Sequence, residues 1–314
     1  KRQGCFKTGD LTTPLFKNGA ENQMQKTVLE IKNLTKYYGK IRGVENLSLQ
    51  LSEGEIFGFI GPNGAGKSTT IRSVMNLINK TSGEILIDGK LFDKDDLNMK
   101  EKIGYLPSEI HLYDDLTVKQ MLDYHESFYK KNIHGRRKEL VERFDLDETK
   151  KIEDLSLGNL KKVGFILAVM HEPKLLILDE PTSGLDPIMQ NVFFEVLKEE
   201  KAKGTTCFYS THILSEVSKI CDRVGIIKDG HLIKIEKIED LSEKNLGFVT
   251  LESPEGDKIL QDLQVENIST DEKFIKFANH FPHNELIKKL AQYEIRRIQI
   301  QEMSLEDLFL HYYK

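Results

Sequence analysis

One segment, Gly61-Pro62-Asn63-Gly64-Ala65-Gly66-Lys67-Ser68, constrains the fold of this 314-residue chain more than any other feature. It matches the pattern Gly-x4-Gly-Lys-Ser/Thr without a mismatch. A short apolar run, residues 55–60, precedes it, and residues 67–78 carry apolar side chains at helical spacing. A chance match in a flexible glycine-rich loop would not be expected to have a strand before it and a helix after it. The sequence therefore predicts a phosphate-binding loop in an α/β fold.

The residues of this loop have different tasks. The glycines let backbone N–H groups close on phosphates at the start of a helix. Lys67 supplies a positive charge to the outer phosphates and is a candidate catalytic residue, while Ser68 offers a hydroxyl to Mg²⁺. We therefore expect ATP and Mg²⁺ as ligands, with nucleotide contacts from Gly61, Pro62, Asn63, Gly64, Ala65, Gly66, Lys67, Ser68 and Thr69.

Two carboxylates follow a second apolar run, residues 175–178. They lie at the C-terminal end of a predicted buried strand, the edge at which ligands bind in such sheets. Asp179 is a candidate Mg²⁺ ligand, and Glu180 is the candidate to orient or deprotonate an attacking water. Taken alone, the pair is equally typical of an ordinary strand end with an acidic turn. The phosphate loop in the same chain favours the catalytic interpretation.

The order of the predicted elements gives the domain organisation. Strands and helices alternate around the phosphate loop and again from residue 175, whereas residues 97–170 are mostly helical, with Thr117 as an expected N-cap. We predict a P-loop NTPase cassette at 27–236 with a mostly parallel sheet, an antiparallel β subdomain and a helical insert at about 108–165. Residues 237–314 are predicted to form a small α+β accessory domain. Residues 1–26 are expected to be a leader, a tag or a disordered tail, with Met24 as a plausible native start.

Composition excludes some classes of function. The chain has 45 basic and 50 acidic residues, a net charge of −5, and the signs are interspersed, so no nucleic-acid partner is expected. No run approaches the roughly 18 apolar residues of a membrane span, so a membrane role needs another chain. The three cysteines, Cys5, Cys207 and Cys221, lie far apart, which favours a reducing, cytosolic compartment.

Three further motifs follow in order. Leu155-Ser156-Leu157-Gly158-Asn159 is similar to the signature Leu-Ser-Gly-Gly-Gln, Ser183-Gly184-Leu185-Asp186 is similar to a D-loop, and Ser210-Thr211-His212 is similar to a switch-histidine segment. Together with the two nucleotide motifs, they make residues 28–235 resemble the nucleotide-binding subunit of ATP-binding cassette (ABC) transporters.

The resemblance implies roles for individual residues. Ser156 and the backbone N–H of Gly158 would meet the γ-phosphate of an ATP bound to a second protomer, and Asp186 would lie among the nucleotide contacts. His212 would contact the γ-phosphate and help hold Glu180. Tyr38 resembles the aromatic residue that stacks on adenine, with Tyr37 as its main rival.

Two departures from the family pattern bear on activity. Ser108 stands where the family usually has a glutamine that reaches Mg²⁺, so either Ser108 acts through water or Glu109 substitutes for it. The signature has Leu157 for its first glycine and Asn159 for glutamine, although Ser156 and Gly158 are kept. These changes predict slow turnover with the phosphate contacts retained.

The resemblance implies the ATPase subunit of a bacterial-type exporter, at the cytoplasmic face of the membrane. Its expected partners are a second ATPase protomer, in a homodimer or a heterodimer, and a separate integral membrane subunit that contacts the helical insert. The segment 304–310 resembles the closing segment of an accessory domain of such exporters. The rival hypotheses are a soluble ABC ATPase acting on ribosomes or DNA, and a regulatory module that binds ATP but hydrolyses little.

Overall fold

The structure is a computed structural model that describes residues 26–302, apart from 94, 244–246, 267, 269–272 and 280. Residues 1–25 of the leader or tail expected at 1–26, and the segment 304–310, therefore lie outside the described residues.

A six-stranded sheet forms the centre of the molecule, with the strand order β10-β9-β3-β8-β7-β6. All neighbouring strands are parallel except β10, which runs antiparallel to β9. The strands β3, β7 and β8 are buried along their whole length, as expected for parallel strands covered on both faces. The bounds are β3 (Ile56–Ile60), β6 (Ile103–Leu106), β7 (Leu175–Asp179), β8 (Thr206–Thr211), β9 (Arg223–Lys228) and β10 (His231–Lys237).

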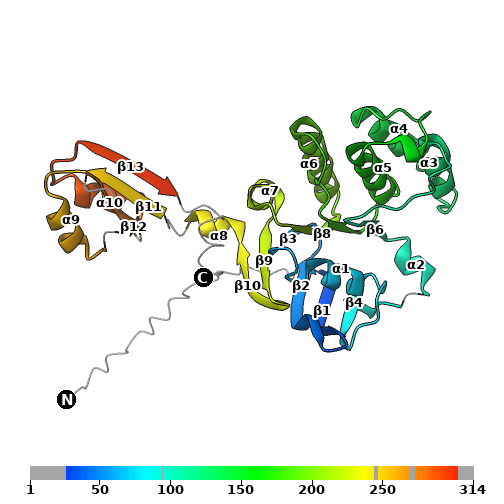
Figure 1. Ribbon diagram of the computed structural model, residues 1–314, viewed down its shortest axis with the longest axis horizontal. Coiled ribbons are helices and arrows are strands. Elements are labelled where there is room, and N and C mark those ends of the chain that lie inside the picture. Colours follow the sequence, from blue (N-terminus) through cyan, green and yellow to red (C-terminus); the bar gives the residue numbers. More distant parts are fainter. Residues whose placement is uncertain are drawn as a thin grey trace, which may run out of the picture.

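A second, antiparallel sheet covers one face of the first. Its order is β2-β1-β4-β5, with β1 (Thr27–Tyr38), β2 (Ile41–Ser52), β4 (Ser82–Ile87) and β5 (Lys90–Leu91). One apolar core joins side chains of this sheet to the helix α1 (Lys67–Val74) and to the central strands. Figure 1 shows α1 beside β1, β2 and β4. The helix that follows the phosphate loop is therefore held in place by both sheets.

Helices cover the other face of the central sheet around a second core. They include α5 (Leu157–Val169), α6 (Pro187–Ala202) and α7 (Leu214–Ile220). The insert adds α3 (Val118–Glu126), α4 (His134–Arg143) and the 3-10 turn η1 (Ile152–Asp154), while the short α2 (Leu97–Lys100) precedes β6. Thr117 caps α3 as predicted, in a reciprocal capping box with Gln120.

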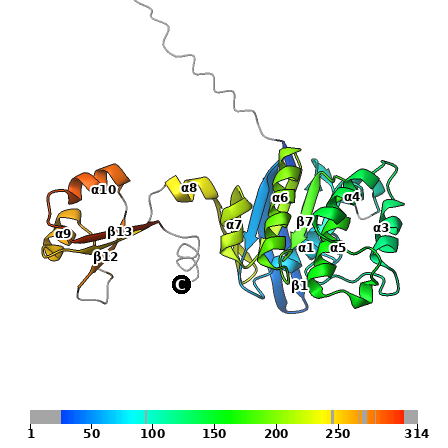
Figure 2. The ribbon, with the colours of Figure 1, turned by 90° about the horizontal axis from the view of Figure 1, so that it is seen from above.

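A third unit follows α8 (Ile238–Glu243). It contains β11 (Gly247–Glu252), α9 (Gly256–Leu263), β12 (Ile275–Asn279), α10 (His283–Leu290) and β13 (Arg297–Glu302). Its antiparallel sheet has the order β12-β11-β13 and its own apolar core. Figures 1 and 2 show it at one end of the molecule. The predicted fold class is confirmed: a mixed, mostly parallel sheet, an antiparallel subdomain, a helical insert and a small α+β unit.

Candidate active site

The phosphate loop joins the end of β3 to the start of α1. Gly64 and Gly66 have φ angles of 81° and 109°, in the left-handed region that favours glycine. A Cβ on Gly66 would lie 2.6 Å from the carbonyl oxygen of Gly43, and one on Gly61 would lie 2.5 Å from that of Ile227. Larger residues at these positions would collide with backbone. The loop geometry thus depends on the glycines that the sequence motif places there.

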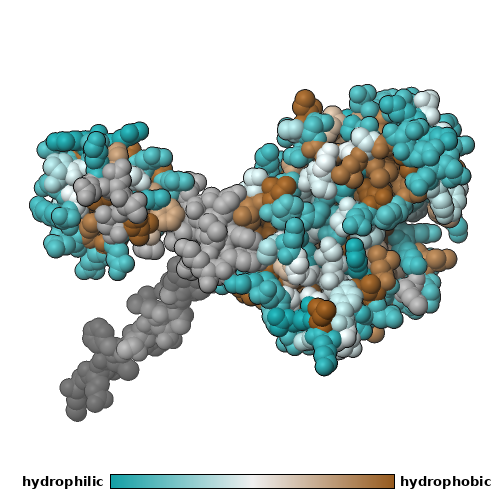
Figure 3. All heavy atoms as spheres, in the orientation of Figure 1, coloured by the Kyte–Doolittle hydropathy of each residue, from teal (hydrophilic) through white to brown (hydrophobic). Residues whose placement is uncertain are grey.

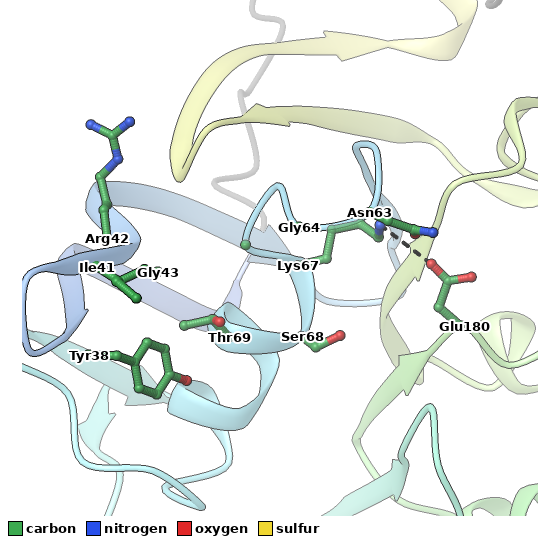
Figure 4. Close-up of a pocket in the computed structure, with 11 residues that line it drawn as sticks. Tyr38, Ile41, Arg42, Gly43, Asn63, Gly64, Lys67, Ser68, Thr69 and Glu180 are labelled. Atoms are coloured by element: carbon green, nitrogen blue, oxygen red, sulfur yellow. Dashed lines mark ion pairs between the residues drawn. The ribbon is translucent and has the colours of Figure 1, made fainter.

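Lys67 is the buried cation of this loop. Its side chain is 6% exposed, and its Nζ donates to the carbonyl oxygen of Gly61 at 2.7 Å. The same Nζ lies 3.4 Å from Oε1 of Glu180, and Figure 4 shows the two side chains pointing toward one another. The fold therefore brings together two candidate catalytic residues that are 113 positions apart in the sequence.

An open pocket of about 370 Å³ lies beside the loop. It is lined by Tyr38, Ile41, Arg42, Gly43, Asn63, Gly64, Gly66, Lys67, Ser68, Thr69 and Glu180. Tyr38 lies toward the opposite side of this pocket from Glu180 (Figure 4). The hydroxyl of Tyr37 instead hydrogen-bonds to Glu45, which raises the pKa of Tyr37. The geometry favours Tyr38 over Tyr37 as the aromatic residue available to a nucleotide base.

The two carboxylates at the end of β7 have different environments. Asp179 is 1% exposed, and its Oδ1 accepts a hydrogen bond from Ser210 Oγ at 2.5 Å. Its Oδ2 is buried and has no hydrogen-bond partner among the described residues. A buried carboxylate oxygen without a partner is costly unless a cation or a water meets it. Asp179 Oδ2 and the Ser68 hydroxyl at the pocket are oxygen ligands of the kind that Mg²⁺ prefers.

Glu180 occupies a less favourable backbone conformation. Its φ of 50° is left-handed, which is uncommon for residues other than glycine. Its N–H donates to the carbonyl oxygen of Ser210 at 3.1 Å. Its Oε2 lies 2.6 Å from Nδ1 of His212, whose side chain is half exposed. A carboxylate held between Lys67 and His212 is placed to orient or accept a proton from a water in the pocket.

The remaining predicted residues lie outside the pocket lining. Ser156 caps α5 by accepting a hydrogen bond from the N–H of Asn159, and it is exposed. Gly158 is packed against the D-loop, since a Cβ there would lie 2.6 Å from the carbonyl oxygen of Gly184. Asp186 caps α6 through the N–H groups of residues 188 and 189. Ser108 follows β6, and Glu109 beside it is exposed. Nucleotide contacts from these residues stay predictions.

Sequence reasoning missed Lys161, in the second turn of α5. It is 1% exposed, and its ammonium group donates to the carbonyl oxygens of Pro107, Ser108 and Glu180. Burial lowers the pKa of Lys161, and the Asp179 and Glu180 charges act in the opposite direction. The apolar stretch 163–170 indicates a buried helix beside this lysine, but it does not indicate which groups the ammonium contacts.

Glu216 was missed as well. It is buried, and its carboxylate accepts hydrogen bonds from the hydroxyls of Thr182, Tyr209 and Thr211. These bonds fix the segment that follows Glu180 and the segment that precedes His212. The role of Glu216 is therefore to hold the backbone of the site.

A phosphate loop at the start of α1, its buried lysine, and an acidic pair at the end of β7, which is separated from β3 by β8 in the parallel sheet, define a P-loop nucleoside triphosphatase. Residues 44–183 match the family model described as ABC transporter. The linearmycin resistance ATP-binding protein LnrL of Bacillus subtilis is 35% identical, with 90% of this chain and 97% of the relative covered. The chain therefore belongs to the ATP-binding proteins of the ABC transporter family.

Two further comparisons agree. The bacitracin transport ATP-binding protein BcrA of Bacillus licheniformis is 34% identical, with 90% of this chain and 96% of the relative covered. The dimeric structure of a post-hydrolysis state of the cassette MJ0796, bound to ADP and Pi, superimposes with a TM-score of 0.61 at 27% identity, covering 67% of this chain and 98% of that one. The prediction of an ATP-binding and ATP-hydrolysing transporter subunit is confirmed. No helix in the described part of the chain is long and apolar enough to cross a membrane.

Proposed function

We propose that this chain powers the export of a small molecule as one of two ATPase protomers bound to a separate membrane subunit, at the cytoplasmic face of the membrane. The observation that carries the hydrolysis step is the placement of Glu180 between Lys67, at 3.4 Å, and His212, at 2.6 Å. The names of LnrL and BcrA, a resistance and a transport protein, favour the export of antibiotic-like compounds.

The chemical step would use residues of the pocket. ATP binds with its phosphates on the loop 61–69, where backbone N–H groups and Lys67 meet the negative charge. Glu180 accepts a proton from the attacking water, while His212 holds the carboxylate in place. The water oxygen bonds to the γ-phosphorus as the bond to ADP breaks. Water is oriented by a carboxylate that is already fixed, which favours the reaction.

Asp179 and Ser68 would hold Mg²⁺. The unpartnered Oδ2 of Asp179 and the hydroxyl of Ser68 supply the oxygen ligands that Mg²⁺ prefers. When bound, Mg²⁺ neutralises charge on the phosphates. Ser108 is the weakest candidate ligand, because its carbonyl is engaged by Lys161 and its side chain is short.

A second protomer would complete the site. Ser156 and Gly158 lie at the N-terminus of α5, where the helix dipole favours an anion, yet neither lines the pocket of its own chain. Contact with the γ-phosphate of a second protomer's ATP would use this end of α5. Closure of two cassettes would then depend on the γ-phosphate, and hydrolysis would release it.

The helical insert offers the surface for the membrane subunit. Tyr113, Tyr124 and Phe128 are 56%, 44% and 57% exposed. The ring of Tyr124 contacts Tyr113 and Phe128 edge to face, with centroid distances of 5.8 and 4.9 Å. Exposed aromatic residues in a cluster are typical of protein interfaces. Figure 3 shows hydrophobic residues among hydrophilic ones on this part of the cassette.

The substitution Glu180→Gln tests the proposal. It keeps the shape of the side chain but removes its basicity, so ATP turnover should fall by about 10²- to 10⁴-fold while ATP binding is retained. ATP should then accumulate a dimer of the variant, seen by size-exclusion chromatography. The control is Glu84→Gln, an exposed carboxylate of β4 outside the pocket lining. Near-normal hydrolysis by Glu180→Gln would show that Glu180 is not the base, and the absence of an ATP-dependent dimer would contradict the shared site.

A further inference from the structure

A buried cation joins three segments of the site. Lys161 belongs to α5, and its Nζ lies 2.8 Å from the carbonyl oxygen of Ser108, 3.2 Å from that of Pro107 and 3.3 Å from that of Glu180. An ammonium group has three N–H donors and no acceptor, so these three carbonyls use all of its donors. The contacts span 53, 54 and 19 positions of the sequence.

A lysine at this place is costly without a specific purpose. Its side chain is almost fully buried, and burying an ammonium group is unfavourable unless its hydrogen bonds are satisfied. The ammonium group of Lys161 donates to carbonyl oxygens rather than to a carboxylate. Its positive charge is therefore not neutralised by a salt bridge, and it interacts electrostatically with the charges of Asp179 and Glu180. A neutral apolar side chain would fill the same space but leave the carbonyls of Pro107 and Ser108 without this donor.

The bond to Glu180 is the most informative of the three. Glu180 has left-handed backbone, a conformation that persists only where its surroundings impose it. Ser210 accepts from the N–H of Glu180, and Lys161 and Ser183 donate to its carbonyl oxygen. Lys161 is the one donor among these that comes from α5. It therefore links the backbone direction of Glu180 to the position of that helix.

The same helix carries the signature residues. Ser156 caps α5, and Lys161 follows five positions later, about 7.5 Å along the helix axis. A displacement at the N-terminus of α5 would move the lysine with it, because the helix is rigid over this length. The ammonium group would pass the displacement to the segment 107–108 and to Glu180.

We propose that Lys161 is a positioning residue for ATP hydrolysis: it fixes the backbone of Glu180 and the segment 107–108 relative to α5. The carboxylate of Glu180 is aimed at the pocket only while the ammonium group holds its carbonyl. This inference rests on the proposed role of Glu180 as the base. Lys161 itself lies outside the pocket lining and contacts the site through backbone.

The variant Lys161→Met removes the ammonium group and keeps an unbranched side chain. Turnover should fall by about 10²-fold, the loss expected when a catalytic group moves by about 1 Å, while KM for ATP changes by less than about threefold. Lys161→Gln keeps an N–H donor on a shorter side chain, so its turnover should lie between that of Lys161→Met and that of the natural chain. Lys162→Met is the matched control, because Lys162 is the next residue of α5 and is partly exposed; its turnover should stay unchanged. Thermal unfolding and binding of a fluorescent ATP analogue check that each variant is folded.

A double variant separates positioning from a general structural role. If Lys161 acts through Glu180, Lys161→Met should lower turnover little further in a Glu180→Gln background, because the group that it positions is already disabled. Three results would overturn the inference. They are full turnover by Lys161→Met, a loss of its activity that is explained by a higher KM for ATP, and a loss of turnover in the double variant equal to the two single losses combined. Normal turnover by Glu180→Gln alone would instead refute the base assignment, so the two failures are distinguishable.

Discussion

His171 predicts how the stability of the cassette depends on pH. It follows α5, is 7% exposed, and stacks on Tyr129 with ring centroids 4.5 Å apart. Its Nε2 lies 3.3 Å from the carbonyl oxygen of Ile103. Burial, and then the neighbouring His125, lowers the pKa of His171 from 6.5 to about 4. The folded protein therefore keeps this ring neutral over a pH range in which the unfolded chain protonates it.

The size and sign of the effect follow from that shift. The folded-state pKa lies below the unfolded-state value, so stability is at its full value above pH 6.5 and is lost as the pH falls toward 4. A difference of about 2.5 pKa units corresponds to about 3 kcal/mol of unfolding free energy. This is a large part of the unfolding free energy of a typical folded domain, which is about 5–15 kcal/mol.

Urea unfolding of the cassette at several pH values between 7.5 and 4.5 measures the effect. His171→Phe keeps a ring against Tyr129 but cannot be protonated, so its unfolding free energy should fall less steeply with acid than that of the natural chain. His111→Phe, at an exposed position, is the matched control and should keep the steep dependence. Parallel pH profiles for the natural chain and His171→Phe would refute the reasoning, because burial would then not suppress protonation of this ring.

Two further predictions concern function. We expect Ser108→Gln to raise ATP turnover about two- to tenfold in a phosphate-release assay, because the longer amide side chain could reach Mg²⁺ and the Ser108 hydroxyl cannot. Unchanged or lower turnover would favour Glu109 as the substitute for the glutamine. Tyr113→Asp should leave ATP hydrolysis of the purified chain intact but reduce its recovery with membranes by about tenfold, since a charge would enter an exposed aromatic cluster. The control Leu91→Asp changes an equally exposed residue on the antiparallel sheet and should remain membrane-bound. Ribosome sedimentation of the natural chain would contradict the transporter assignment.

The local parts of the site were predictable because their signals are short in sequence. The run that forms β3, the glycines of the loop and the start of α1 are contiguous, so strand, turn and helix could be assigned together. The apolar run of β7 likewise fixes the position of Asp179 and Glu180 at a strand end. Burial on both faces explains why these strands read as continuous apolar runs rather than alternating ones.

The long-range parts could not be predicted from spacing. Nothing near Lys161 in the sequence indicates that its ammonium group meets carbonyls at 107, 108 and 180. The left-handed backbone of Glu180 is imposed by tertiary contacts and has no residue preference to signal it. In the third unit, α9 and β12 were not predicted, because the short, charged segments around them carry weak periodicity; α9 becomes recognisable only when Ile259 and Leu263 pack in the core.

The packing of α5 explains why that helix can link the two ends of the site. Every residue of α5 from Val163 to Val169 is buried, so this part of the helix is surrounded by protein on all sides. Gly104 of β6 lets the helix lie directly on the strand, since a Cβ there would collide with the carbonyl oxygen of Ala168 at 1.9 Å. A helix fixed in this way moves as a body, because close-packed interiors transmit displacement instead of absorbing it. Ser156 at the start of α5 and Lys161, five positions further along, therefore cannot shift independently. A phosphate bound at Ser156 would change the position of the Glu180 backbone through Lys161.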